Sequence, residues 1–251
     1  MQFEIKRDTL LKSLSVAHNI IERKNTIPIL ANVLLEIKNN ILNIVATDLD
    51  IVFQDKISDL KIESEGSTTT SATVLYDLLR KLPTNLDVTF VLEGKNKLKI
   101  TAKNSKFNLL CLPIDDFPNF SNDFKNEALS LDGKKFLALL NKTKIAMSND
   151  DTRHYLNGIF IHPTASNKNS YLTGVATDTH RLSSSSIPIQ DTKNFKSFIL
   201  PKKTVFQLAN LLQDNNQNIA MTVGEGKIQF KIGNSSIISK VIDGKFPDYK
   251  K

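Results

Sequence analysis

Two kinds of hydrophobic spacing follow one another along the chain and predict both strands and helices. Residues 1–8 alternate apolar and charged side chains, so the first strand is expected there. Leu10, Leu14 and Ala17 then recur at helical spacing, which predicts a helix over 8–21 with Asp8 at its start. The other elements expected in this half are strands at 29–37, 41–46, 51–57 and 98–102 and a helix over 73–82.

The same order of elements returns in the second half. Phe136, Leu140 and Met147 share one face of a helix expected over 133–147. Ile228, Phe230 and Ile232 alternate with polar residues, which predicts a strand with one buried face. The other elements expected here are strands at 156–161, 171–176 and 182–187 and a helix over 201–213.

Short sequence motifs repeat at nearly constant spacing. Val-Ala-Thr-Asp at 45–48 returns at 175–178, and the Thr-Val start of the helix at 73 returns at 204. Asp-Phe-Pro at 116–118 returns loosely as Lys-Phe-Pro at 245–247. We therefore predict two copies of one α+β module, at 1–121 and 126–249, each with two helices on one face of a mostly antiparallel sheet.

Composition and charge narrow the class of protein. The 251 residues are 40% hydrophobic and 24% charged, which is typical of globular proteins that bury a core. No apolar stretch is long enough for a signal peptide or a membrane helix, and the lone Cys111 suits a reducing cytoplasm as a small buried side chain. The net charge of +7 is concentrated in residues 125–251, which hold 18 basic and 10 acidic side chains. A one-sided positive field of this kind is compatible with a nucleic-acid partner.

Patterns typical of enzymes are nearly absent. The chain has no phosphate-binding glycine loop, no zinc-ligand spacing and no nucleophile elbow, so no cofactor and no metal are expected. Asp178, His180 and Arg181 could form a phosphoesterase centre. However, Asp178 has a repeat partner, Asp48, in a module without the His-Arg pair, which favours a turn-capping role for both carboxylates.

Five motifs together resemble one family. They are Thr-Ile-Pro-Ile-Leu-Ala-Asn at 26–32, Ala-Thr-Asp-Leu at 46–49, Tyr-Leu-Asn-Gly at 155–158, Ala-Thr-Asp-Thr-His-Arg-Leu at 176–182 and Asp-Gly-Lys-Phe-Pro-Asp-Tyr at 243–249. In this order they resemble the bacterial DNA polymerase III beta subunit, the replicative sliding clamp. The resemblance implies the DNA-clamp fold and a non-catalytic processivity factor that encircles duplex DNA without reading its sequence.

The resemblance also implies two functional surfaces. Matching positions in a DNA-facing surface are Arg23, Lys24, Arg80, Ser148, Asn149, Lys202 and Lys203. Matching positions in a peptide-binding pocket for client proteins are Leu156, Thr177, Thr179, His180, Arg181, Leu182 and Pro247. The implied partners are duplex DNA, the DNA polymerase III catalytic subunit, the clamp loader and other proteins with a clamp-binding motif.

One departure from the family pattern concerns length. Family members carry three modules and form a head-to-tail ring homodimer, whereas this sequence reaches Lys251 as the second repeat ends. A chain that lacks the third module is expected to lack one side of the ring interface and part of the peptide pocket. Two alternatives stay open at this point: a conventional basic DNA-binding protein, and a phosphoesterase centred on Asp178 and His180.

Overall fold

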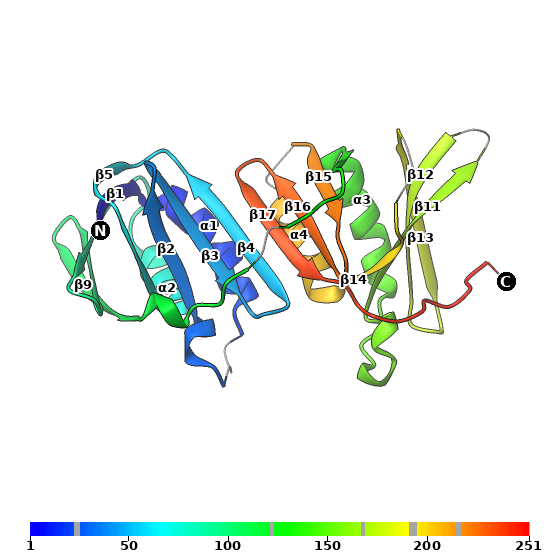
Figure 1. The fold of residues 1–251 in the computed structure, drawn as a ribbon, viewed down its shortest axis with the longest axis horizontal. Coiled ribbons are helices and arrows are strands. Elements are labelled where there is room, and N and C mark those ends of the chain that lie inside the picture. Colours follow the sequence, from blue (N-terminus) through cyan, green and yellow to red (C-terminus); the bar gives the residue numbers. More distant parts are fainter. Residues whose placement is uncertain (23–25, 121–122, 167–168, 191–194, 214–216, 251) are drawn as a thin grey trace. The chain divides into compact units, whose positions relative to one another are not determined.

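The computed structural model describes residues 1–22, 26–120, 123–166, 169–190, 195–213 and 217–250 (Figure 1). The chain divides into two compact units. Unit 1 comprises Met1–Asn122 with Asn234–Ser236, and unit 2 comprises Asp123–Gly233 with Ile237–Lys251. No helix among the described residues is long and apolar enough to cross a membrane. The α+β class is confirmed in both units, and each unit is described by itself.

Unit 1 is an antiparallel sheet with two helices on one face (Figure 1). Its strands lie in the order β4-β3-β2-β6-β9-β8-β7-β1-β5. Helices α1 and α2 pack against each other, and their buried side chains face the sheet. The elements are β1 (Gln2–Lys6), α1 (Arg7–Ile20), η1 (Pro28–Ala31), β2 (Asn32–Lys38), β3 (Ile41–Thr47), β4 (Ile51–Ile57), β5 (Lys61–Ser64), β6 (Gly66–Ser71), α2 (Ala72–Lys81), β7 (Asp87–Glu93), β8 (Lys97–Ala102), β9 (Ser105–Leu112) and η2 (Ile114–Asp116).

Unit 2 also combines antiparallel strands with two helices, but its described strands form two sheets instead of one. One sheet has the order β10-β15-β16-β17 and the other the order β13-β12-β11-β14. Phe136 of α3 stacks on Phe230 of β16 at 5.9 Å between ring centroids and joins helix to sheet. The elements are β10 (Leu129–Leu131), α3 (Gly133–Thr143), η3 (Lys144–Ala146), η4 (Asp151–Leu156), β11 (Gly158–Ser166), β12 (Asn169–Thr177), β13 (Leu182–Ile189), β14 (Phe198–Pro201), α4 (Lys202–Gln213), β15 (Ile219–Val223), β16 (Lys227–Ile232) and β17 (Ser235–Lys240).

Local capping explains where two of the helices begin. Asp132 precedes α3, and its Oδ1 accepts a hydrogen bond from the Lys135 N–H at 2.9 Å. Ser71 plays the same part for α2, because its hydroxyl accepts from the Val74 N–H at 3.4 Å. Each side chain satisfies a backbone donor that the first helical turn leaves without a partner.

Three predicted boundaries were wrong. The strand expected at 29–37 starts at Asn32, because Pro28 opens the 3₁₀ turn η1 and Ile29 and Leu30 turn into a cluster with Phe117. The strand expected at 156–161 starts at Gly158, since Leu156 ends the 3₁₀ segment η4. The helix expected to reach 147 ends at Thr143 and continues only as the 3₁₀ turn η3.

The alternating pattern of β16 was also interpreted too simply. Gln229 was expected on an open face, but it is 5% exposed. Its register partner on β15, Thr222, is buried as well. This part of the sheet is therefore covered on both faces, which alternation in one strand does not predict.

Candidate DNA and peptide surfaces

A tight loop carries four of the predicted peptide-pocket residues. It links β12 to β13 and is held by two side chains at its start. The Thr177 hydroxyl accepts from the Thr179 N–H at 3.1 Å and donates to the Arg181 carbonyl at 2.7 Å. Asp178 Oδ1 accepts from the N–H groups of His180 and Arg181 at 3.1 and 3.0 Å. These bonds satisfy backbone groups that the turn would otherwise leave without partners.

Unit 1 builds the same loop between β3 and β4. The Thr47 hydroxyl accepts from the Leu49 N–H and donates to the Ile51 carbonyl, both at 2.9 Å. Asp48 Oδ1 accepts from the N–H groups of Asp50 and Ile51 at 2.9 and 2.7 Å. The turn-capping role expected for both repeated carboxylates is confirmed.

The residue after each Asp adopts the left-handed backbone region. Thr179 has φ of 81° and Leu49 has φ of 77°. Such values are costly for a branched side chain and persist only where surrounding bonds hold them. The paired Thr and Asp bonds supply that constraint, so this loop conformation belongs to the repeated module.

The second oxygen of Asp178 completes a local ion pair. Oδ2 lies 2.9 Å from Nε of Arg181. Desolvation acts to raise the pKa of Asp178, but the N–H groups of Arg181 and His180 and the Arg181 guanidinium outweigh it and hold this pKa below its ordinary value. Both oxygens are thus engaged in the loop. Among the described residues no three His, Cys, Asp or Glu side chains are grouped to hold a metal ion.

The predicted pocket residues differ in exposure, and we call the buried Leu156 the base and the exposed side chains the rim. Leu156 is 1% exposed and packs with Val175, Ile199 and Phe246. Leu182, at the start of β13, is 49% exposed. The remaining members of the exposed rim are Thr179, His180, Arg181 and Pro247, while Thr177 is half-buried.

Sequence reasoning missed one residue at this rim. Arg153 of η4 places Nη1 3.4 Å from the Thr179 hydroxyl. Its Nη2 also forms an ion pair with Asp150 at 2.8 Å. Arg153 lies two residues before the Tyr-Leu-Asn-Gly motif at 155–158, so no motif residue marks it.

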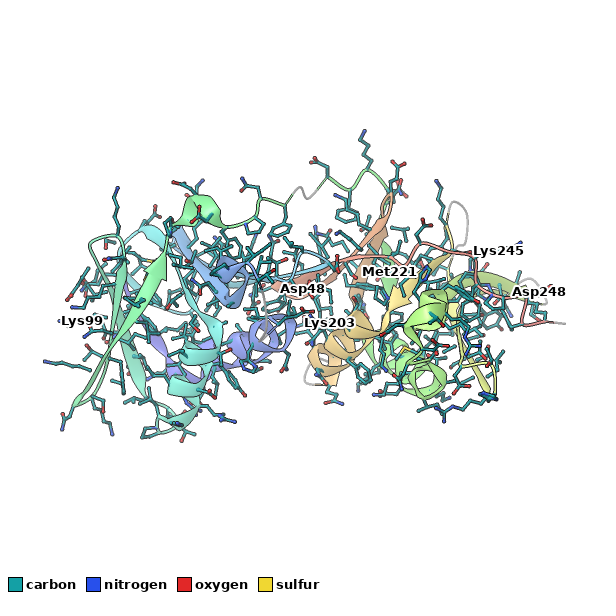
Figure 2. The ribbon with its side chains drawn as sticks, turned by 90° about the horizontal axis from the view of Figure 1, so that it is seen from below. Asp48, Lys99, Lys203, Met221, Lys245 and Asp248 are labelled. Atoms are coloured by element: carbon teal, nitrogen blue, oxygen red, sulfur yellow. The ribbon has the colours of Figure 1, made fainter. Side chains whose placement is uncertain are left out.

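The segment after β17 carries Pro247 and lies along unit 2. The Ile242 N–H donates to the Ile199 carbonyl of β14 at 3.0 Å. Phe246 stacks on Phe160 of β11 with 5.0 Å between ring centroids and 9° between planes. Lys245 and Asp248 of this segment are labelled in Figure 2. Pro247 is therefore placed by the anchored residue directly before it.

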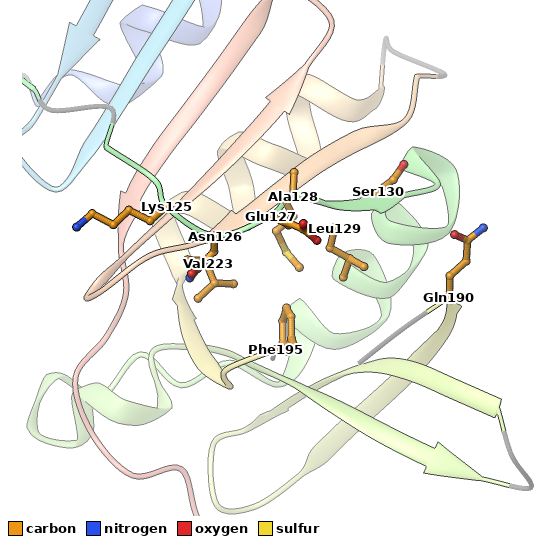
Figure 3. Close-up of a pocket in the computed structure, with 10 residues that line it drawn as sticks. Lys125, Asn126, Glu127, Ala128, Leu129, Ser130, Gln190, Phe195 and Val223 are labelled. Atoms are coloured by element: carbon orange, nitrogen blue, oxygen red, sulfur yellow. Dashed lines mark hydrogen bonds between the residues drawn. The ribbon is translucent and has the colours of Figure 1, made fainter. Parts of the chain in front are cut away.

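A separate cavity of 570 Å³ lies at the β10 edge of unit 2 (Figure 3). Its apolar wall includes Leu129, Phe195 and Val223, and Lys125 and Glu127 stand at its border. None of the residues predicted for the peptide pocket lines it. The cavity and the predicted peptide surface are therefore different places on unit 2.

Several residues predicted to face DNA lie at the helix ends. Asn149 and Lys202 meet through a hydrogen bond from Lys202 Nζ to Asn149 Oδ1. Lys203 follows at the start of α4 (Figure 2). Arg80, in the last turn of α2, lies over the Tyr76 ring and pairs with Asp77 at 3.1 Å.

Three of the predicted DNA contacts differ from the others. Ser148 is 4% exposed, and its hydroxyl accepts from the Asp150 N–H at 3.0 Å, so it shapes the turn next to Asn149 instead of presenting its side chain. Arg23 and Lys24 lie outside the described residues.

Two consecutive α+β modules with matching loops and basic helix ends define a clamp-type fold, and the comparisons agree. Residues 1–121 match the family model for the N-terminal domain of the DNA polymerase III beta subunit, and residues 130–248 match that for its central domain. The chain belongs to the DNA polymerase III beta subunit family, the beta sliding clamps. The sequence-based identification of a non-catalytic processivity subunit is confirmed by this membership.

Individual relatives support the assignment across the whole chain. The beta sliding clamp of Caulobacter vibrioides is 37% identical over 251 residues, which cover 99% of this chain and 67% of the relative. That of Rickettsia bellii is 34% identical, with 98% of this chain and 64% of the relative covered.

Solved structures of clamps have the same fold. A Caulobacter crescentus beta sliding clamp superimposes with a TM-score of 0.95 at 37% identity, over 100% of this chain and 67% of that chain. A Bartonella birtlesii clamp bound to griselimycin gives 0.94 at 34% identity, over 100% of this chain and 67% of that chain. The chain therefore spans about two thirds of the length of these clamps.

Proposed function

We propose that this chain supplies two clamp modules, 1–121 and 126–249, to a ring that encircles duplex DNA in the bacterial cytoplasm. In the full-length form the ring is a head-to-tail homodimer. The observation that carries the proposal is membership of the sliding clamp family across both modules. Partners of the complete ring are the DNA polymerase III catalytic subunit, the clamp loader and other proteins with a clamp-binding motif.

The DNA surface is assigned to cations at helix ends. Arg80, Lys202 and Lys203 would contact phosphates, and Asn149 adds a polar group beside Lys202. Ser148 shapes the adjacent turn, and Arg23 and Lys24 are assigned on sequence alone. Because phosphate contacts carry no base information, such a surface holds any duplex loosely and lets it slide. Retention then depends on ring closure and not on the strength of single ion pairs.

The affinity of this chain for a short linear duplex tests whether DNA is retained by ring closure or by direct ion pairs. We expect weak binding at low salt, and a Lys202→Ala, Lys203→Ala double variant should flatten the dependence of log affinity on log salt by about one to two units. Fluorescence anisotropy with a labelled duplex over a salt series measures both. Lys99→Ala is the matched control, since Lys99 lies on β8 and is ion-paired with Glu93 at 3.3 Å.

Tight binding with a steep salt dependence would contradict a mechanism based on ring closure. It would favour direct phosphate binding of the kind used by conventional DNA-binding proteins. An equal effect of Lys99→Ala would show that net charge, and not the proposed surface, determines the affinity.

The peptide surface is assigned to the rim around the Thr177–Arg181 loop. Leu182 and Pro247 offer exposed apolar area, Leu156 packs in the core beneath this surface, and His180 and Arg181 supply polar groups next to Leu182 in the chain. An apolar surface with a few placed polar groups suits a short extended segment of a client protein. We extend the proposal to griselimycin, which is bound to the Bartonella birtlesii clamp.

Leu182→Ser tests the peptide surface. The substitution removes the exposed part of the leucine side chain, roughly half of its apolar surface, from contact with the ligand. The dissociation constant for griselimycin should therefore rise about tenfold. Isothermal titration calorimetry measures the change. Leu110→Ser is the matched control, because Leu110 is 82% exposed on β9 of unit 1. Equal losses in both variants, or no loss with Leu182→Ser, would refute the assignment.

A further inference from the structure

The exposed side of α4 carries an aromatic ring. The core of unit 2 takes up the other side of this helix, where Val205, Leu208 and Leu212 are buried. Phe206 lies outside that buried side and is 40% exposed. The other Phe and Tyr side chains that the structure describes are all buried or half-buried. Packing of the core therefore does not account for a phenyl ring at this position.

Phe206 has cationic and polar neighbours. The Lys144 ammonium of η3 lies 5.7 Å from the Phe206 ring centroid, as in a cation–π contact. Lys144 Nζ also donates to Asn141 Oδ1 at 2.7 Å. On α4 itself, Lys203 stands three positions before Phe206 and is its neighbour on the helix surface. Ile145, next to Lys144 in the chain, is 62% exposed. We call these residues the Phe206 face.

The segments that build the Phe206 face contain no carboxylate side chain. Residues 133–146 and 201–213 hold six lysines and no Asp or Glu. The nearest carboxylates along the chain on either side of 133–146 are engaged locally, because Asp132 caps the start of α3 and Asp150 pairs with Arg153. Charge complementarity therefore calls for a partner with negative charge.

An exposed phenyl ring beside lysines matches an unpaired nucleotide better than a base pair. In a duplex the bases stack on each other, so a side chain at the surface meets phosphates, sugars and groove edges. A single strand presents the faces of its bases, and stacking of one base on an aromatic side chain tightens binding about 5- to 100-fold. Lysines near the ring neutralise the phosphates on either side of that base.

Phe206 and Lys144 can act on neighbouring parts of one nucleotide. The ring is carried by a helix whose other side is buried, so its place on the surface is set by the fold. An exposed cation–π contact is weak, and the four-carbon stem of a lysine is flexible. The Lys144 ammonium can therefore turn from the ring to the phosphate of a nucleotide whose base stacks on Phe206.

We propose that the Phe206 face binds single-stranded DNA: Phe206 stacks on an unpaired base, and Lys144 and Lys203 contact the phosphates beside it. This inference goes beyond the proposed clamp function, in which a closed ring holds a duplex through its phosphates. It rests on the proposed DNA surface only through Lys203, which belongs to both.

Fluorescence anisotropy with a labelled oligothymidylate of about twelve nucleotides tests the proposal at low salt. We expect this chain to bind the oligothymidylate more tightly than a duplex of the same length. Phe206→Ala should weaken binding of the oligothymidylate about 5- to 100-fold and change binding of the duplex by less than about twofold, because only an unpaired base offers its face to the ring. Phe206→Tyr keeps an aromatic ring and should bind nearly as well as the parent chain.

Ile145→Ala is the matched control. It removes exposed apolar area beside Lys144 but no aromatic ring, so the affinity for the oligothymidylate should change by less than about twofold. Lys144→Ala should reduce the slope of log affinity against log salt by about 0.7, the contribution of one phosphate contact on a single strand. Equal losses for Phe206→Ala and Ile145→Ala would show that apolar area, and not stacking, determines the affinity.

A tryptophan at position 206 reports stacking directly. The chain contains no tryptophan, so Phe206→Trp places a single indole on the Phe206 face. A base that stacks on the indole quenches its emission, so the oligothymidylate should quench it and the duplex should not. Leu110→Trp is the control, because Leu110 is 82% exposed on β9 of unit 1. Neither nucleic acid should quench the indole there.

Three results would overturn the inference. The first is equal affinity for the oligothymidylate and the duplex, and the second is an equal loss of both in Phe206→Ala, which would indicate a contact with sugars. The third is an oligoglutamate of the same charge that competes as well as the oligothymidylate, which would show recognition of charge alone.

Failure of the proposed DNA surface would look different. If Phe206→Ala had no effect while the Lys202→Ala, Lys203→Ala double variant still flattened the salt dependence, stacking would be refuted and the proposed DNA surface would stand. If the double variant left the salt dependence for the duplex unchanged while Phe206→Ala still weakened binding of the oligothymidylate, the duplex surface would fail and the stacking site would stand.

Discussion

Phe136→Ala is expected to lower the free energy of unfolding of unit 2 by about 3–5 kcal/mol. Phe136 is 0% exposed and stacks on Phe230 between α3 and the sheet. Alanine removes the ring's buried area and leaves a cavity that a well-packed core fills only in part. Urea denaturation followed by circular dichroism, with resonances of unit 2 assigned by NMR, measures the loss for that unit.

Phe206→Ala is the control for this prediction. Phe206 lies on α4 and is 40% exposed, with the Lys144 ammonium 5.7 Å from its ring centroid. Removal of a half-exposed ring and one exposed cation–π contact should change stability by about 1 kcal/mol or less. If both variants lost the same stability, the contact between α3 and β16 would not be central to the core.

Arg7→Ala is expected to lower the free energy of unfolding of unit 1 by about 2–4 kcal/mol. Arg7 is 8% exposed, and its Nε and Nη2 donate to the carbonyls of Leu79 and Arg80 at 2.8 and 2.9 Å. Both carbonyls belong to the last turn of α2, where a helix runs out of its own donors, and the Leu79 carbonyl accepts in addition from the Leu82 N–H at 3.2 Å. A charged donor at this end also interacts favourably with the helix dipole. Chemical denaturation with NMR probes in unit 1 measures the effect.

Arg80→Ala separates this capping role from surface charge. Arg80 pairs with Asp77 in solvent, and the Arg80 side chain is 58% exposed. Exposed pairs of this kind contribute about 0–1 kcal/mol, so stability should change little. A large loss for Arg80→Ala, or a negligible one for Arg7→Ala, would show that α2 is not held through Arg7.

The predictable part of the fold depends on local spacing. Strand β4 has the bounds that its apolar run predicted, 51–57, and both first helices begin within a residue of the expected position. These elements carry their own signals, because apolar periodicity and capping residues act within a few positions of each other. The repeat of Val-Ala-Thr-Asp also predicted a shared turn, and both copies form the same hydrogen bonds.

The errors arose where distant contacts outweighed local preference. Ile29 and Leu30 read as strand residues, but burial against Phe117, far along the chain, favours a 3₁₀ turn. Gln229 read as an exposed polar residue, yet packing on the second face of β16 buries it. Neither contact can be recognised from the few neighbouring residues on which an assignment of secondary structure from sequence depends.

In the candidate surfaces, too, local features were predictable from the sequence and contacts between distant residues were not. The loop with Thr177 and Asp178 is local, so the motif that names its residues also determines its hydrogen bonds. The approach of Arg153 to Thr179 needed the tertiary structure, since η4 brings the arginine there from outside the motif. The functional roles of the rim residues stay predictions that rest on the family resemblance.

By itself, the sequence determined the α+β class, the duplication, the capped loops and the family, because each depends on spacing between neighbours or on motifs in order. Only the tertiary structure decided that His162 meets Tyr249 and that Phe246 stacks on Phe160. Those contacts join residues more than 80 positions apart. They depend on how strands β11 and β12 and the last segment pack together, and no local preference encodes that packing.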